Sequence, residues 1–121
     1  MFMFENLVVY KKAMGFVEGI YVLSRKIHDK DIKSQMKRAA LSIPLNIAEG
    51  NGRNTAKEKA QFYKTARGSL FECIPLLEIC LRLGRISKSE HNHLYTLSEE
   101  IGKMLNALIK SLGNWENRTR N

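Results

Sequence analysis

At 121 residues with 44% hydrophobic side chains, the chain can form one domain that buries a core without metals or disulfides. No apolar run approaches the ~20 residues that a helix needs to span a bilayer. The apolar start at residues 1–4 is also too short for the core of a signal peptide. These features argue against membrane and secreted classes, and we expect a cytoplasmic protein.

The net charge of +8 is unevenly distributed along the sequence. Between Arg25 and Arg67, eleven Lys and Arg occur with four Asp and Glu, whereas the rest of the chain has nine with eight. A concentrated positive field attracts polyanions and speeds their encounter. The excess therefore favours a nucleic-acid partner. A basic surface that only maintains solubility is the alternative.

The first half of the chain has the periodicity of two amphipathic helices. The first is expected over about residues 5–28, where apolar residues recur at alternating spacings of three and four. Asp31 is suited to cap the second helix, which is expected over about residues 32–49. Pro44 should bend this second helix, because proline removes one backbone hydrogen bond.

The third helix is predicted to run the full length of the bundle. Thr55-x-x-Glu58 is a capping box that marks its start. It continues to Leu83, and Gly84 provides a typical glycine stop. Pro75 lies inside it and should bend it or interrupt one hydrogen bond.

The fourth helix opens with a second capping box, Ser87-x-x-Glu90, and is expected to end at Gly113. Residues 114–121 lack periodicity, so we expect a flexible C-terminal tail. The connections between consecutive helices are short, which makes neighbouring helices antiparallel. The sequence therefore predicts an all-α fold, an antiparallel up-down-up-down four-helix bundle over residues 1–113.

One face of the second helix is polar although it borders the apolar face. The residues of this polar face are Gln35, Arg38, Ser42, Asn46 and Glu49. With Ser69 and Glu72 of the third helix, they form a candidate polar seam or oligomer contact. A buried network of this kind must be hydrogen-bonded throughout to be tolerated. Arg53 could return to Glu49 across the turn. In the alternative interpretation, Arg38 or Arg53 faces a phosphate.

The residues that usually carry catalysis form no recognisable constellation. His91 and His93 are two apart on a helix and point about 200° from each other, so they cannot share a metal. Cys73 and Cys80 lie about 10 Å apart along a helix, beyond disulfide reach, and suit an apolar core. No Gly-rich phosphate loop follows a strand. We therefore expect a non-enzymatic protein without a metal or cofactor.

The candidate nucleic-acid contacts are cations from the basic part of the sequence. They are Arg25, Lys26, Lys30, Lys33, Lys37, Arg38, Arg53, Lys57, Lys64 and Arg67. Such charges suit backbone phosphates and give affinity without sequence reading. No aromatic platform for single strands is evident, and a helix-turn-helix is disfavoured by the length and apolarity of the third helix.

Several motifs also resemble a known family. They are Phe4-x-x-Leu7-x-Val9-Tyr10-Lys11-x-Ala13, Arg38-Ala39-Ala40, Ser42-Ile43-Pro44, Asn46-Ile47-Ala48-Glu49-Gly50 followed by Arg53, and Ala66-x-Gly68-Ser69-Leu70-x-Glu72. These motifs are similar to those of the small four-helix-bundle proteins encoded in intervening sequences of bacterial 23S ribosomal RNA genes. Pro75 departs from the family pattern, which affects the expected straightness of the third helix.

The resemblance implies a function only in outline. The family has no assigned enzymatic activity. Related bundles include the accessory proteins of diversity-generating retroelements, which form basic, barrel-like homopentamers and associate with nucleic acid and a reverse transcriptase. The resemblance thus implies a homo-oligomer, a pentamer by analogy, that binds RNA or DNA without sequence specificity, with a reverse transcriptase or ribosomal RNA as possible partners. A structural or protein-interaction module with no nucleic-acid role is the alternative.

Overall fold

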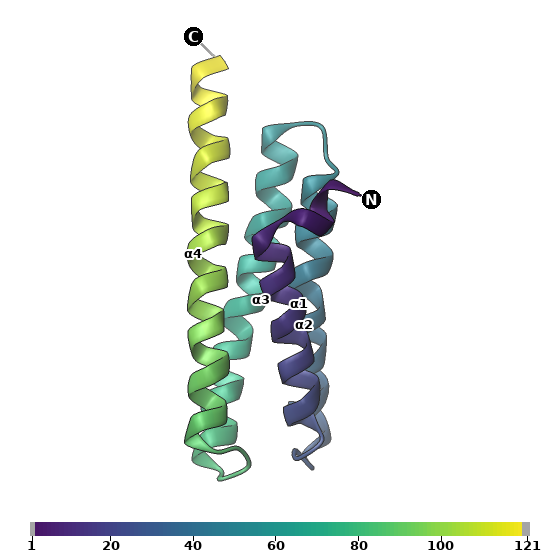
Figure 1. Ribbon diagram of the computed structural model, residues 1–121, viewed down its shortest axis with the longest axis vertical. Helices are drawn as coiled ribbons and strands as arrows, with labels where there is room; N and C mark the ends of the chain where they lie inside the picture. Colours follow the sequence, from purple (N-terminus) through teal and green to yellow (C-terminus); the bar gives the residue numbers. More distant parts are fainter. Residues whose placement is uncertain (1, 120–121) are drawn as a thin grey trace.

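The chain folds into four α-helices and one short 3-10 helix, and residues 2–119 contain no strand. The computed structural model describes these residues. The elements are η1 (Met3–Asn6), α1 (Val8–Ser24), α2 (Lys30–Asn51), α3 (Ala56–Arg82) and α4 (Lys88–Thr119). Figure 1 shows the helices side by side, with short connections at alternating ends, so that consecutive helices run antiparallel. The expected all-α bundle is confirmed.

Each helix packs against two neighbours around a shared core. Among the described residues, the backbone of α1 approaches α2 and α4 and that of α3 approaches the same two helices, whereas the diagonal pairs have no close backbone approach. The pairing of α2 with α3 is the most extensive. None of the described helices combines the length and the apolar character that crossing a membrane requires.

The start of α1 differs from the expectation. Leu7 has an extended backbone, with φ −68° and ψ 128°, and separates η1 from α1, so the helix begins at Val8. Of the apolar residues before Leu7, Met3 and Phe4 belong to η1. At the other end α1 stops at Ser24, short of residue 28, and the Ser24 hydroxyl donates to the carbonyl of Tyr21 at 2.7 Å.

The cap of α2 is Asp29, and the prediction of Asp31 was wrong. One carboxylate oxygen of Asp29 accepts from the backbone N–H groups of Asp31 and Ile32, both at 3.0 Å. The helix therefore begins at Lys30, two residues earlier than expected. Asp31 lies in the first turn, where a negative charge interacts favourably with the helix dipole.

The ends of α3 follow the sequence pattern closely. Thr55 accepts from the backbone N–H of Glu58 at 3.1 Å and so caps the first turn. After Arg82 the chain turns at Gly84, whose φ of +70° is the left-handed conformation that glycine adopts without strain. Both α3 and α2 continue through their internal prolines, Pro75 and Pro44.

The start of α4 was predicted correctly, but its end was not. The backbone N–H of Glu90 donates to the Ser87 hydroxyl at 3.0 Å, and the N–H of Ser87 donates to the Glu90 carboxylate at 2.8 Å. The helix does not end at Gly113 but continues to Thr119. Gly84 is the one described glycine with a positive φ, so Gly113 does not turn the chain. Of the expected tail 114–121, residues 114–119 are helical, and 120–121 lie outside the described residues.

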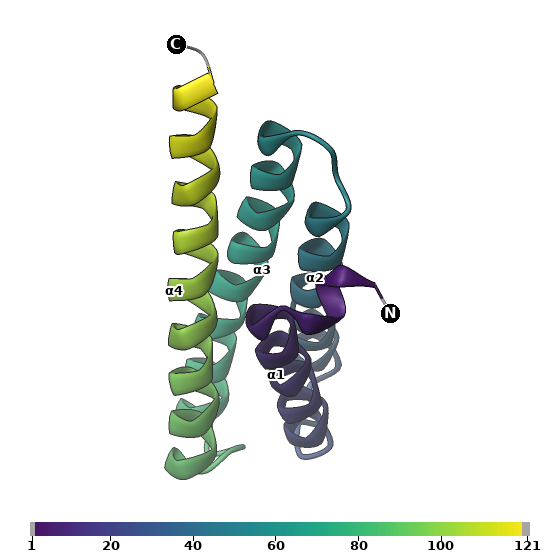
Figure 2. The same cartoon turned by 45° about the horizontal axis from the view of Figure 1, so that its top comes forward.

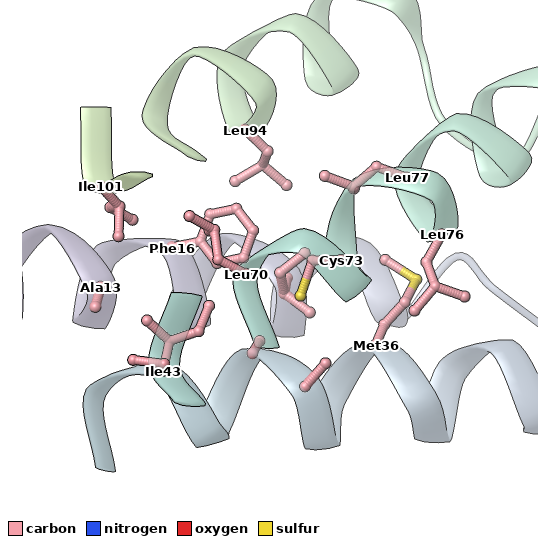
Figure 3. Packing of buried hydrophobic residues seen from close by; sticks show 14 of the residues in the cluster. Ala13, Phe16, Met36, Ile43, Leu70, Cys73, Leu76, Leu77, Leu94 and Ile101 are labelled. Atoms are coloured by element: carbon pink, nitrogen blue, oxygen red, sulfur yellow. The ribbon is translucent and has the colours of Figure 1, made fainter. Parts of the chain in front are cut away.

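All four helices contribute side chains to one continuous core. Figure 3 shows side chains from all four helices facing one another, among them Phe16 of α1, Ile43 of α2, Leu70 of α3 and Ile101 of α4, and all four are buried. Cys73 is buried in the same cluster as a free thiol, as expected from its position on α3.

Two glycines allow a test of close packing between α2 and α3. A Cβ on Gly50 would lie 2.9 Å from the Tyr63 ring and 3.0 Å from the Phe62 Cβ, whereas a Cβ on Gly68 would meet no atom within 4 Å. We predict that Gly50→Ala lowers the free energy of unfolding by ~1–3 kcal/mol through overpacking. Gly68→Ala should raise it by ~0.5–1 kcal/mol through helix propensity. Urea denaturation at one protein concentration measures both, and shifts of the same sign would contradict the packing.

Candidate functional site

The candidate phosphate-binding cations fall into two groups at opposite ends of the bundle. The two connections on which they centre are separated by the 22 residues of α2, about 33 Å at ~1.5 Å per residue, while Arg38 and Arg67 lie nearer the middle of the bundle. The first group surrounds the α1–α2 connection and comprises Arg25, Lys26, Lys30, Lys33, Lys37 and Arg38. The second follows the end of α2 and comprises Arg53, Lys57, Lys64 and Arg67. The basic region of the sequence is therefore spread along the bundle and not gathered at one end.

The fold adds three cations that the sequence analysis missed. The α3–α4 connection lies at the same end of the bundle as the α1–α2 connection (Figures 1 and 2) and carries Arg82, Arg85 and Lys88, all exposed. The Lys26 ammonium contacts the Glu90 carboxylate at 2.7 Å and joins the two connections. Hydrogen bonds from Lys26 and from the Ser87 backbone hold the pKa of Glu90 below its usual value.

We call residues 25–38 and 82–90 together the basic end. They contain nine Lys and Arg with three Asp and Glu, which accounts for six of the eight net positive charges of the chain. The opposite group is weaker, since residues 49–67 contain five Lys and Arg with two Glu. The positive field is thus concentrated on one end of the molecule.

Some of the predicted cations are already engaged within the protein. Arg53 pairs with Glu49 at 2.9 Å, as the sequence suggested, and its guanidinium also lies 4.7 Å from the centre of the Phe62 ring. Lys37 lies 4.7 Å from the centre of the Tyr21 ring. Arg67 donates to the Asn106 side chain at 3.0 Å.

Other cations have no such engagement. No ion pair or side-chain hydrogen bond within the described part of the chain involves Arg25, Lys30, Lys33, Arg38, Lys57, Lys64, Arg85 or Lys88. Most of them belong to the basic end. Their charges are the ones that a bound polyanion could neutralise.

The polar seam is smaller than predicted and lies within the protomer. The Ser42 hydroxyl accepts from the Ser69 hydroxyl at 2.8 Å and from the Asn46 amide at 2.9 Å. The same amide also donates to the Ser42 carbonyl at 2.8 Å. These three half-buried side chains link α2 to α3. The remaining residues of the predicted seam are exposed and do not join it: Gln35, Arg38, Glu49 and Glu72.

The buried thiols are poor nucleophiles. Burial, with a contribution from nearby Glu72, raises the pKa of Cys73 to about 12. Burial also raises the pKa of Cys80, whose sulfur lies 3.7 Å from the sulfur of Met36.

His91 stacks on Tyr95 with ring centres 5.8 Å apart. Among the described residues no three His, Cys, Asp or Glu gather as a metal site would require.

The fold and its surfaces define a class: a basic, all-α four-helix bundle. The chain matches the family of 23S rRNA-intervening sequence proteins over residues 5–107, and it belongs to that family. The resemblance carried by the sequence motifs is thereby confirmed.

A solved structure shares this fold. It is a protein of unknown function from the S23 ribosomal protein family of Bacteroides thetaiotaomicron, with a TM-score of 0.79 and 24% sequence identity. The alignment covers 85% of this chain and 99% of that one. No match was found among curated proteins.

The raised thiol pKa values give a direct prediction. Because Cys73 and Cys80 are buried and protonated at pH values below their raised pKa, iodoacetamide at about pH 8 should leave both unmodified in the folded protein. In urea both should be alkylated, as measured by mass spectrometry. Alkylation of either thiol in the folded protein would contradict their assignment to the core.

Proposed function

We propose that this chain is a non-enzymatic, oligomeric protein of the cytoplasm that binds RNA or DNA through phosphates, as an accessory factor of a ribonucleoprotein. The observation that carries the proposal is the basic end. It gathers nine cations from two connections that are more than forty residues apart in the sequence. A field of this kind supplies sequence-independent affinity and rapid encounter.

The geometry of the basic end suits phosphate binding. The N-termini of α2 and α4 also lie there, but Asp29 and the Ser87–Glu90 pair cap them, so the positive field comes from the Lys and Arg side chains. Arg25, Lys30 and Arg85 are exposed on long, flexible side chains. Contacts from such side chains position a backbone but do not read bases. The proposed binding is therefore non-specific in sequence.

Assembly is supported by apolar residues on the outer face of α3. Phe71, Pro75, Ile79 and Leu83 recur at a spacing of four, and the three largest of them are 42–57% exposed. Leu45 of α2 is 63% exposed. Contiguous exposed apolar residues typically mark an interaction surface.

We propose that copies of this chain cover this face in a homo-oligomer, a pentamer by analogy with the related bundles. An oligomer would present several basic ends at once and gain avidity for a polyanion. By the same analogy, a reverse transcriptase or ribosomal RNA is a proposed partner.

The apolar face of α3 also favours a second candidate function. A protein-interaction module would use that face and keep its charge only for solubility. The two functions differ in salt dependence, because phosphate binding weakens steeply with salt and an apolar protein contact does not.

The first test is binding of a labelled structured RNA and a DNA duplex by fluorescence anisotropy, from about 50 to about 300 mM salt. We predict micromolar or tighter binding with a log–log slope of several units. The triple variant Arg25→Gln, Lys30→Gln, Arg85→Gln should weaken binding and reduce the slope on the duplex by about 2.7, at ~0.9 per lost contact.

The matched control for this test removes the same charge elsewhere. Lys11→Gln, Lys103→Gln, Lys110→Gln neutralises three exposed cations outside the basic end and should change the slope much less. Equal losses in the two variants would assign the binding to net charge alone. Weak, salt-independent binding by the unmodified protein would remove the nucleic-acid function.

The assembly can be tested separately by sedimentation velocity. The variant Ile79→Glu, Leu83→Glu places charge on the apolar face of α3 and should lower the mass of the wild-type oligomer. Val22→Glu changes a comparably exposed residue of α1, 55% exposed, and should leave the mass unchanged. A monomeric wild-type protein would contradict the proposed assembly.

A further inference from the structure

At the end opposite the basic end, α4 extends beyond α1 and has no α1 residues beside it. Lys12, close to the start of α1, contacts Glu100 of α4 at 2.7 Å. Because α1 begins at Val8 and runs antiparallel to α4, the part of α4 that follows Met104 extends past the start of α1. Figure 1 shows α4 continuing beyond α1 while η1 turns away across the bundle, where it contacts α2.

An apolar groove of about 380 Å³ lies where α4 extends beyond α1. Its walls include Leu7 and Val8 on one side and Met104, Ala107 and Leu108 on the other. Val8 of α1 is 56% exposed at this groove. Elsewhere α1 and α4 pack closely, since a Cβ on Gly19 would lie 2.6 Å from a methyl carbon of Leu94. The groove is thus an apolar surface of the kind that packs against a helix, and no helix among the described residues covers it.

The dimensions of the groove fit two turns of a helix. Met104 and Ser111 are seven residues apart, or about 10 Å along the axis. Ala107 and Ser111 are exposed and one turn apart, and small residues at this spacing permit interaxial distances of about 8–10 Å. Leu108 and Met104, both half-buried, would flank the incoming helix.

The rim of the groove is positively charged. Lys11 is three residues from Val8, while Lys103 and Lys110 are four and three residues from Ala107, so each is a surface neighbour of the groove. All three are exposed, and none has an ion pair within the described residues. Of the nearby acidic groups, Glu100 is engaged by Lys12 and Glu5 belongs to η1.

We propose that this groove docks an acidic amphipathic helix of a partner protein. The apolar face of that helix would lie on Ala107 and Leu108, and its flanking Asp or Glu side chains would face Lys11, Lys103 and Lys110. A second copy of α4 is disfavoured as the occupant, because it would place lysines against lysines. The groove is also open along its length, which suits a helix better than a small molecule.

The test uses two synthetic peptides of about 15 residues, near the length at which an isolated helix becomes stable. They share Leu and Ala at helical spacing and differ only in flanking Glu or Lys. Fluorescence anisotropy with the full chain should show that the Glu peptide binds. The affinity of the Lys peptide should be at least about tenfold lower, because like charges facing each other at an interface are repulsive.

Two variants locate the binding. Ala107→Glu should lower the affinity for the Glu peptide about tenfold, since the new side chain fills the groove and adds like charge. Its fold is checked by circular dichroism and thermal melting, and Val22→Glu on the far half of α1 is the matched control. The exchange Lys103→Glu, Lys110→Glu should reverse the preference in favour of the Lys peptide, an outcome that loss of structure cannot produce.

Several outcomes would overturn the proposal. These are equal binding of the two peptides, an unchanged affinity in Ala107→Glu, or binding of anionic vesicles while neither peptide binds. A fall in the oligomer mass on Ala107→Glu would instead assign the groove to a second copy. None of these readouts uses nucleic acid, so the groove can fail while the basic end still binds RNA.

Discussion

The register between α2 and α3 is the constraint on which the rest of the structure depends. Contacts along the whole pair fix it: Met36 meets Cys80, Ser42 is hydrogen-bonded to Ser69, and Gly50 lies against aromatic side chains of α3. A substituent on Gly50 would push the pair apart, and a shift of register would break the hydroxyl pair. With these two helices fixed, α1 and α4 complete the core from either side, and the α3–α4 connection lies beside the α1–α2 connection.

The basic end and the apolar groove lie at opposite ends of the same bundle. The basic end comes from the connections after α1 and α3, whereas the apolar groove lies where α1 begins and α4 continues. Nucleic acid and a partner helix could therefore be bound at the same time without competing for space. This arrangement suits an accessory protein, which brings two other molecules together and needs no reaction centre of its own.

Local signals were enough to predict much of the fold. The helix cap at Thr55 and the stop at Gly84 involve neighbouring residues only, and both are confirmed. Gly113 is the same residue type as Gly84, yet it does not end its helix, because a glycine stop depends on a backbone conformation that sequence does not reveal. Tertiary features were missed for a similar reason. Arg85 joins the basic end only through the pairing of distant connections, and the groove exists because α1 begins as late as Val8.

In the proposed function, polyanions bind the end of the bundle that carries most of its charge. Lysine acetylation, with and without a structured RNA, followed by mass spectrometry, tests it on the unmodified protein. We expect RNA to protect Lys30, Lys33 and Lys88 at the basic end, while Lys103 and Lys110 of α4 remain reactive. Uniform protection of all five lysines, or protection confined to α4, would contradict it.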